Sequence, residues 1–421
     1  MKVVFVSKGY GFAYVIETKH FISTTIFTQK HLLKAYFSCR KNKRNTINAL
    51  KFEINLEQNL YNLQKEISLH TYKPSRSICF AVKYPKIREI FAADFKDRTV
   101  HHLLVSYLEP YFEKRFIYSS FACRKSKGTL SATTYIQKCL RKITKNSTKK
   151  AYYGKFDIKS FFTCIHKNIL EEILISNIQK GFHGNLQKEL IWLTRVILNN
   201  NPTENYSVRG DINLLKQVPH HKSLFNVPQN KGLPIGNLTS QFFANVYLNE
   251  LDQYVKRDLK IKYYTRYVDD IVILSDTMEN IYKWREQINI FLKNKLKLIL
   301  HPDKDKYGSV YSGIDFVGYI IKPRYTLSRQ RVVGNLKNKL RLFNQGLLLV
   351  SQNQKQTVLP LHTPPSKGDL SKMLAMINSY YGHFRHVNCF NLRKDIYENH
   401  FGCLKEYLEP VDEYSYFKLI K

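Results

Sequence analysis

Three aspartates in two separate segments are the residues whose types and spacing could do chemistry in this chain of 421 residues. Asp269 and Asp270 stand between two runs of β-branched and aromatic residues, YYTRYV and IVIL, where a hairpin is expected. Two like charges at the tip of a hairpin repel each other unless a cation neutralises them, so a divalent metal ion is a physical reason to place them there. By itself, the doublet also fits a solvated turn.

Asp157 supplies the second acidic position that favours a metal site. It lies in AYYGKFDIKSFF (151–162), where the apolar neighbours predict a buried strand, and an acid there is costly unless it is paired or metal-bound. The chain between Asp157 and Asp269 has room for two helices and a loop that return it to a neighbouring strand. Two Mg²⁺ ions about 3.5 to 4 Å apart could then activate a 3′-hydroxyl and stabilise a leaving pyrophosphate. Hard oxygen donors suit Mg²⁺ and argue against zinc or iron.

The hydrophobic patterns predict the elements that must position these acids. A strand is expected to carry Asp157, and a hairpin is expected to place Asp269 and Asp270 together at its tip. Upstream, apolar residues near helical spacing predict one amphipathic helix over 47–68. A strand, a basic hairpin and a helix that begins near Asp97 are expected to follow.

Other segments are less regular. Residues 1–28 alternate apolar and polar side chains, which predicts one or two strands. Within them KGYGFAYV (8–15) is like the aromatic octapeptide of an RNA recognition motif, but too few residues precede it to complete that fold. Residues 200–232 predict an ordered insertion or loop. Basic helices are expected after Pro323, interrupted by a linker over 350–367.

The charge balance points to a polyanionic partner. There are 67 Lys and Arg residues against 33 Asp and Glu residues, a net charge of +34, and the basic residues occur along the whole chain. Nucleic acid is the natural candidate; no apolar run approaches the roughly 20 residues of a membrane-spanning helix. The N-terminal apolar run is too short for a signal peptide, so we expect a cytoplasmic protein that does not bind membranes. The seven cysteines are scattered without metal-site spacing and are expected to be reduced thiols.

Three segments in order along the chain resemble motifs A, B and C of reverse transcriptases: FDIKSFF (156–162), GLPIGNLTSQ (232–241) and YVDD (267–270). The resemblance covers roughly residues 50–395. It implies an α+β right-hand polymerase fold with fingers, an antiparallel-sheet palm and a helical thumb. The implied domains are an N-terminal extension (1–50), fingers (51–150), a palm with an insertion (151–322, with 200–232 inserted) and a basic helical thumb with a C-terminal segment (323–421).

The resemblance also implies roles for individual residues. The catalytic residues would be Asp157, Asp269, Asp270 and Lys304, with Lys304 as a general acid if it is not an ordinary turn lysine. The metal ligands for two Mg²⁺ ions, with Mn²⁺ as an alternative, would be Asp157, Ile158 and Asp269. The residues that would contact the incoming dNTP are Lys86, Arg88, Arg124, Phe162, Ile235, Gly236 and Gln241. Phe162 would act as the steric gate against a 2′-hydroxyl, although a core aromatic is the alternative. Phe316 and Gly318 would form the primer grip.

Motif B departs from the pattern that is common in the family. Ile235 stands where many reverse transcriptases have a glutamine, and Gln241 stands where they have a proline. This form resembles enzymes of diversity-generating retroelements and bacterial defence-associated reverse transcriptases. An apolar side chain cannot hydrogen-bond the sugar or base, which implies relaxed fidelity or unusual templating.

The function expected from the sequence is cDNA synthesis from an RNA template. The expected partners are a cognate structured noncoding RNA, the cDNA product and dNTPs; an accessory protein or a second subunit stays open. We expect no RNase H or endonuclease domain after the thumb. Two biological settings stay open, an anti-phage defence system and a diversity-generating retroelement. The rival hypothesis is a catalytically silent RNA-binding scaffold.

Overall fold

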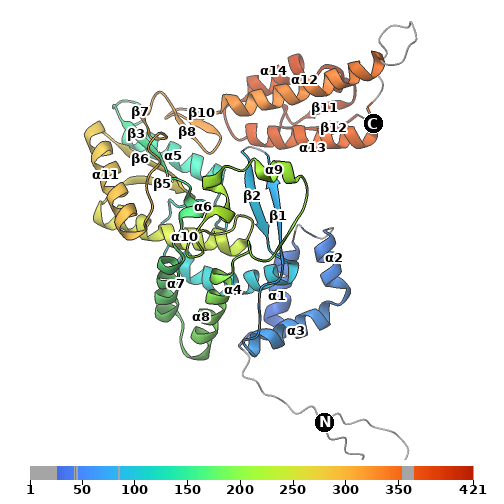
Figure 1. The fold of residues 1–421 in the computed structure, drawn as a ribbon. Coiled ribbons are helices and arrows are strands. Elements are labelled where there is room, and N and C mark those ends of the chain that lie inside the picture. Colours follow the sequence, from blue (N-terminus) through green and yellow to red (C-terminus); the bar gives the residue numbers. More distant parts are fainter. Residues whose placement is uncertain (1–25, 42, 44–45, 84–85, 353–364, 421) are drawn as a thin grey trace, which may run out of the picture. The chain divides into compact units, whose positions relative to one another are not determined.

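The computed structural model describes residues 26–41, 43, 46–83, 86–352 and 365–420, and for 346–352 it describes the backbone alone. The octapeptide at 8–15 and nearly all of the strand region expected in 1–28 lie outside the described residues. The chain divides into two compact units (Figure 1). They are Met1–Arg115 with Phe162–Tyr247, and Phe116–Phe161 with Leu248–Lys421.

Helices form much of the first unit. α1 (Gln29–Arg40) packs on α4 (Phe95–Glu113) through a buried face that includes Leu32 and Tyr36. The single helix expected over 47–68 is wrong, because the structure has α2 (Ile47–Ile54) and α3 (Leu56–Ser68). The backbone leaves helical geometry at Asn55, with φ −121° and ψ 47°, so the apolar pattern continues through a break that it does not reveal.

A small sheet lies in the same unit, with strand order β2-β1-β4. β1 (Ser77–Val82) and β2 (Arg88–Ala92) form the expected hairpin, and α4 follows, capped by the Asp94 side chain. β4 (Tyr206–Val208) comes from the insertion and pairs with β1 in parallel. The same segment, 200–232, also contains α9 (Ile212–Lys216).

Further α-helices lie in the described part of the first unit. They are α6 (Phe161–Cys164), which begins at the unit boundary, α7 (Lys167–Gly181), α8 (Gly184–Asn199) and the first part of α10 (Leu238–Gln253). α7 packs on α8, and α8 packs on α4.

A four-stranded antiparallel sheet forms the centre of the second unit (Figure 1). Its order is β5 (Tyr263–Tyr267), β6 (Asp270–Ser275), β3 (Tyr152–Asp157) and β7 (Lys306–Ser309). Successive strand residues point to opposite faces. One face packs on α11 (Met278–Lys295), where Gly154 approaches Ile281 so closely that a Cβ would lie 2.6 Å from its Cγ2 atom.

The other face of this sheet carries apolar residues that pack with α5 (Thr129–Ile143). Tyr153 of β3, and Val272 and Leu274 of β6, belong to that core. Lys155 and Asp157 follow Tyr153 at two-residue spacing on the same face. The sheet therefore buries the middle of this face and presents charged residues toward its end.

The C-terminal part of the second unit has its own core. A three-stranded antiparallel sheet precedes it, with β8 (Ile314–Phe316), β9 (Tyr319–Ile321) and β10 (Thr326–Ser328). The helices are α12 (Gln330–Gln352), α13 (Lys367–Phe384) and α14 (Phe390–His400). They pack around residues such as Leu340, Tyr381 and Phe401. The expected linker at 350–367 is shorter than predicted, because α12 continues to Gln352 and α13 begins at Lys367.

A terminal hairpin was not expected from the sequence. β11 (Leu408–Val411) and β12 (Tyr416–Leu419) pair in antiparallel register, and β12 packs on α13. All seven cysteines are free thiols, as predicted. Among the helices of the described residues, none combines the length and the apolar character needed to cross a bilayer.

Candidate active site

Asp157 and the Asp269–Asp270 pair meet at one end of the sheet in the second unit. Asp157 of β3 is the register partner of Asp270 of β6, and the backbone N–H of Ile158 donates to the Asp269 carbonyl at 3.3 Å. The expectation that both acids sit at the hairpin tip needs a correction, because Asp270 already opens β6 and pairs with Tyr267. Asp269 alone belongs to the turn, so the two acids have different backbone settings.

The hairpin turn has two residues, Val268 and Asp269. Val268 has φ 55°, in the left-handed region, which is a true outlier for a β-branched residue. Two-residue hairpin turns favour positive φ because it matches the twist of the strands, and they usually take Asn or Gly there. The backbone conformation of the turn that carries Asp269 is therefore unfavourable in energy for this sequence. Contacts with the surrounding structure must stabilise the turn.

Two lysines compensate the acids. Lys304 Nζ forms an ion pair with Asp157 Oδ2. The His301 N–H donates to the Asp157 carbonyl at 2.7 Å, which fixes the turn that carries Lys304 beside the end of β3. Lys155 Nζ lies 3.4 Å from Asp270 Oδ1. Each ammonium group thus neutralises a carboxylate that would otherwise repel its neighbour.

The environment of Asp270 is only partly neutralised. Burial raises the pKa of Asp270 above its ordinary value, and the nearby Asp157 charge adds to the rise. Lys155 and, more weakly, Arg329 lower the pKa of the same group. Lys155 also donates to the Asp315 carbonyl at 3.1 Å, and Asp315 pairs with Arg329. A chain of polar contacts, which passes through the Asp315 backbone, therefore leads from Asp270 to Arg329 just before α12.

The donor set at this position fits Mg²⁺ bound together with a phosphate ligand. Within the described part of the chain, no group of three or more His, Cys, Asp or Glu residues is arranged to hold a metal ion by itself. Asp157 and Asp269 offer only carboxylate oxygens, and the apolar side chain of Ile158 is buried, so that residue has only its carbonyl to offer. Mg²⁺ in nucleotide enzymes uses one or two carboxylates plus substrate phosphates rather than a closed protein cage.

The motif B segment is bonded to β2 in the first unit. The Phe91 N–H donates to the Ile235 carbonyl at 2.9 Å, and the Ala93 N–H donates to Asn237 Oδ1 at 3.1 Å. Gly236 between them is exposed and has φ +124°. A Cβ on Gly236 would lie 3.2 Å from the Phe91 carbonyl oxygen, so only glycine lets this turn approach the strand.

The contacts that the other residues are expected to make with the incoming nucleotide stay predictions. In the first unit Phe162 is half-buried, and its carbonyl accepts from the Leu233 N–H at 2.8 Å. Gln241 is exposed on α10. Lys86 and Arg88 are exposed at the β1–β2 turn, where their charges face solvent.

Arg124 and Lys127 have structural uses in the second unit. Arg124 donates from one nitrogen to the carbonyls of Ile117 and Ser120, both at 2.7 Å. Lys127 donates to the Tyr118 carbonyl at 2.9 Å and lies 3.5 Å from the centre of that ring. These bonds favour a role in shaping the loop, and the contact of Arg124 with the incoming dNTP stays a prediction.

The primer-grip residues differ from each other in exposure. Phe316 is fully buried and packs in the core of the sheet. Its ring therefore cannot reach a nucleic acid in this conformation. Gly318 follows in the β8–β9 turn with φ +97° and is half-buried. A primer grip at Gly318 would contact the primer strand through the backbone of the β8–β9 turn.

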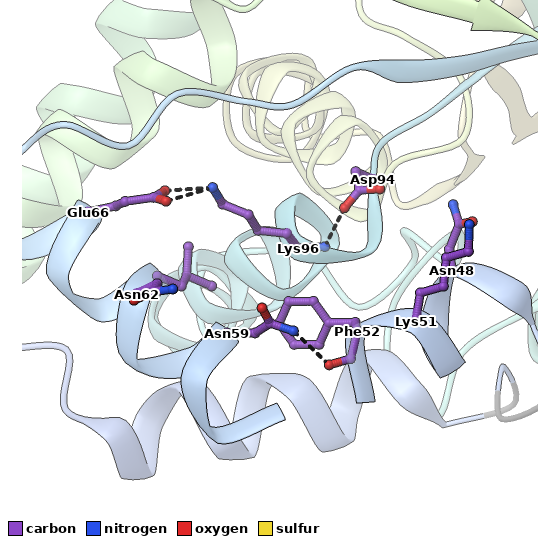
Figure 2. Close-up of a pocket in the computed structure, with 9 residues that line it drawn as sticks. Asn48, Lys51, Phe52, Asn59, Asn62, Glu66, Asp94 and Lys96 are labelled. Carbon is purple, nitrogen blue, oxygen red and sulfur yellow. Dashed lines mark hydrogen bonds and ion pairs between the residues drawn. The ribbon is translucent and has the colours of Figure 1, made fainter. Parts of the chain in front are cut away.

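A pocket of about 340 Å³ lies in the first unit, among α2, α3 and the start of α4 (Figure 2). Lys96 forms an ion pair with Glu66 at 2.7 Å across it, and Asn59 donates to the Phe52 carbonyl at 2.9 Å. Its two lysines and two acids balance in charge. None of the residues predicted for the active site lines it.

Sequence reasoning missed four charged residues in the hydrogen-bond networks next to the acids: Lys155, Asp315, Arg266, which bonds the Val268 carbonyl, and Asp252, the partner of Arg266. Strand periodicity could have found Lys155, because it lies two residues before Asp157 on the same face. Asp315 and Asp252 come from segments with no catalytic pattern. Arg266, three residues before Asp269, is fully buried, which composition cannot reveal in so basic a chain.

The chain is similar to reverse transcriptases in sequence. The family model described as reverse transcriptase (RNA-dependent DNA polymerase) matches residues 82–321. Protein YkfC of Escherichia coli K12 is 23% identical over 337 residues, which cover 72% of this chain and 81% of that protein. The putative COX1/OXI3 intron 2 protein of Saccharomyces cerevisiae is 23% identical over 378 residues, 74% of this chain and 40% of the yeast protein.

Among solved structures, the chain is similar to apo telomerase from Candida tropicalis truncated from its C-terminal domain. The TM-score is 0.45 at 12% identity, over 61% of this chain and 55% of the telomerase chain. The chain thus spans little more than half of that structure. The family match, in contrast, runs over more than half of this chain and includes all three aspartates at the end of the sheet. The protein therefore belongs to the reverse transcriptase family of RNA-dependent DNA polymerases and has its right-hand α+β fold.

Proposed function

We propose that this protein synthesises cDNA on an RNA template by nucleotidyl transfer with two divalent metal ions, Mg²⁺ or Mn²⁺. The observation that carries the proposal is the meeting of Asp157 with Asp269 and Asp270 across β3 and β6. Asp157 and Asp269, with the carbonyl of Ile158, would hold the ions. When bound, the ions supply Lewis-acid activation of a 3′-hydroxyl and neutralise charge on the triphosphate.

The chain's own residues orient the acids and handle protons. Lys155 holds the Asp270 carboxylate from the same sheet face, which keeps that acid beside Asp157. Lys304 Nζ is paired with the Asp157 carboxylate. Released from that pair, the ammonium group is a general acid for the leaving pyrophosphate.

Several further residues are proposed to select the nucleotide. Lys86 and Arg88 would bind the triphosphate through charge-assisted contacts. Phe162 would crowd a 2′-hydroxyl and so favour dNTPs. The motif B turn at Ile235 and Gly236 would pack against the nucleotide through backbone and apolar surface. Further dNTP contacts are proposed for Arg124 and Gln241, and Gly318 would place the primer strand beside its buried neighbour Phe316.

The template is proposed to be a cognate structured noncoding RNA, with cDNA as the product in the cytoplasm. The basic helices of the C-terminal region would follow the duplex backbone, because phosphate contacts give affinity without a sequence code. The Ile235 and Gln241 departures in motif B support a place among defence-associated or diversity-generating enzymes. Sequencing the cDNA recovered from cells, together with the neighbouring DNA, separates these two settings. Template and variable repeats would indicate the retroelement.

The mechanism is tested by Asp269→Asn and Asp157→Asn. Incorporation of dTTP is measured on poly(rA) primed with oligo(dT) in Mg²⁺. Each change should lower the rate by about a thousandfold or more, because each removes a carboxylate proposed to hold the metal ions that neutralise the transferred phosphate. The matched control is Asp276→Asn, an exposed acid just beyond the other end of β6, which should stay within about twofold of wild type.

The rival function is a silent RNA-binding scaffold. It predicts that the unaltered protein binds RNA tightly but incorporates no dNTP, and that the Asp269 change alters nothing. Activity that survives Asp269→Asn at more than about a tenth of the wild-type rate would refute the proposed mechanism.

A further inference from the structure

Arg266 is a fully buried arginine three residues before Asp269, on β5 of the second unit. Burial of a guanidinium ion is costly unless its charge and its donors are matched. Its partner is Asp252 near the end of α10, also with an exposed fraction of 0%. Nε donates to Asp252 Oδ1 at 2.8 Å and Nη2 donates to Oδ2 at 2.6 Å. This bidentate pair fixes the plane of the guanidinium group.

The Arg266 guanidinium group, oriented in this way, donates two further hydrogen bonds. Nη2 also donates to Ser120 Oγ at 3.0 Å, which anchors the same edge. Nη1 donates to the carbonyl oxygen of Val268 at 3.0 Å. The Tyr264 hydroxyl donates to Asp252 Oδ1 at 2.7 Å and so holds the acid in turn. The network therefore ends on the backbone of the hairpin turn.

The Val268 carbonyl is the part of the turn where such a bond has the greatest effect. Val268 has φ 55°, which costs energy for a β-branched residue. Its carbonyl belongs to the peptide group that joins Val268 to Asp269. Since that group is planar, a bond that orients the carbonyl also orients the N–H of Asp269 and the start of its backbone.

We propose that Arg266 is a positioning residue that uses its Asp252 pair as an anchor and holds the Val268–Asp269 peptide, so that the Asp269 carboxylate faces Asp157. The inference rests on the proposed role of Asp269 in metal binding. A lysine cannot replace Arg266 in this role, because one ammonium group cannot bind a carboxylate in bidentate fashion and also reach a carbonyl beyond it. The alternative is that the buried pair only stabilises the fold.

Two variants separate these alternatives. Arg266→Lys keeps a positive charge beside Asp252 but loses the fork. The double variant Arg266→Met with Asp252→Leu removes both charges together, so no unpaired ion is left in the core, and buried pairs replaced in this way often keep their stability. Ser120→Ala is the matched control, because it removes a bond to the same guanidinium group but not the one to Val268.

The readouts are Mn²⁺ binding followed by electron paramagnetic resonance, and kcat, KM for dTTP and the half-saturating Mg²⁺ concentration on poly(rA)–oligo(dT). For folded Arg266→Lys and for the double variant, we expect the Mn²⁺ Kd and the half-saturating Mg²⁺ concentration to rise about tenfold. The kcat should fall by a similar factor, while KM for dTTP changes less than about twofold. Ser120→Ala should stay within about twofold of wild type in all of these quantities.

Three outcomes would overturn the inference. One is unchanged Mn²⁺ affinity in a variant that keeps a cooperative thermal transition. Another is an equal loss in Ser120→Ala, which would assign the effect to the network as a whole. The third is loss of the thermal transition in both Arg266 variants, because the pair would then hold the fold rather than the turn. Failure of the proposed function is distinguished by two other results, whatever the Arg266 variants do. Either the wild type incorporates no dTTP, or Asp269→Asn keeps the wild-type rate.

Discussion

The Lys304 ammonium group forms an ion pair with the Asp157 carboxylate, although 147 residues separate the two in the chain. The Lys304 side chain is 46% exposed and that of Asp157 is 17% exposed, so solvent screens the pair only in part. The pair occupies Oδ2 of the acid that is proposed to bind a metal ion. If Asp157 binds that ion, lysine and metal ion would compete for one carboxylate, and a released lysine could donate its proton.

Lys304→Met is expected to change metal binding and catalysis in opposite directions. Removal of a partly exposed ion pair should lower the Mn²⁺ Kd by up to about fivefold, because such pairs contribute about 0.2–1 kcal/mol. If Lys304 is the general acid, the same change should slow nucleotide addition by about 10² to 10⁴-fold. Isothermal titration with Mn²⁺ and single-turnover dTTP addition measure the two effects.

The control for this prediction is Lys306→Met. Lys306 is an exposed lysine two residues away at the start of β7. The Lys306→Met variant should bind Mn²⁺ with the wild-type affinity and add nucleotides at nearly the wild-type rate. The Lys304 role would be refuted if both variants slowed the reaction equally.

Phe162 is expected to determine which sugar the enzyme accepts. If its half-buried ring crowds the 2′ position, Phe162→Ala should raise the kcat/KM for GTP relative to dGTP by about ten- to a hundredfold, the scale on which pockets distinguish one hydroxyl group. Phe162→Tyr keeps the ring and should keep the discrimination. Steady-state incorporation of both nucleotides on one RNA template measures the ratio. An unchanged ratio in the alanine variant would assign Phe162 to the core instead.

The central part of the site was predictable from the sequence because its signals are local. Paired acids between two strand-forming runs predict a hairpin, and an acid in a buried strand needs a cation. The antiparallel pairing of β3 with β6 then places Asp157 opposite Asp270. What the pattern could not give was the exact register, which moves Asp270 from the turn into the strand.

The rest depended on contacts between distant segments. The hydrophobic period of 47–68 runs through Asn55, so only the packing of two helices shows the break. The β11–β12 hairpin rests on α13, and its pattern is too short to predict alone. The Arg266–Asp252 pair joins a strand to a helix, and in a chain with 67 basic residues no sequence signal distinguishes that one arginine.

Gly236→Ala is expected to damage the motif B turn through space as well as through backbone strain. The new Cβ would lie 2.8 Å from Ile90 Cγ2 and 3.2 Å from the Phe91 carbonyl oxygen, at φ +124°. We expect a loss of about 1–3 kcal/mol in the free energy of unfolding. The KM for dNTP should rise if the turn packs on the nucleotide. Urea unfolding and steady-state kinetics measure these effects.

Gly128→Ala is the matched control for the glycine prediction. Gly128 also has positive φ, at +146°, but a Cβ there would meet nothing within 4 Å. It carries the backbone penalty without the clash, so its loss of stability should be smaller and its KM for dNTP should stay unchanged. Equal effects in the two variants would show that the approach of Gly236 to β2 is unimportant.

Asp97 is expected to make the stability of the protein depend on pH. This carboxyl of α4 is 1% exposed and accepts bonds from the Tyr72 hydroxyl and the Ser75 N–H, both at 2.8 Å. Burial raises the pKa of Asp97 from 3.8 to about 6, although the bonds from Tyr72 and Ser75 oppose the rise. The folded state thus binds the proton more tightly than the unfolded state. Its stability is greatest below the unfolded pKa and falls as the pH rises from about 4 to 6.

Asp97→Asn removes this titration while keeping the shape of the side chain. Relative to the wild type, the variant should gain roughly 3 kcal/mol in the free energy of unfolding between pH 4 and pH 7, since the pKa shift sets the size of the difference. Tyr72→Phe removes a hydrogen bond that lowers the pKa of Asp97. The free energy of unfolding of this variant should therefore continue to fall to a higher pH than that of the wild type. Urea unfolding at several pH values measures all three curves. Parallel curves for the wild type and Asp97→Asn would mean that the buried carboxyl has the same pKa in the folded and unfolded chains, because only a difference between those two values can give stability a dependence on pH.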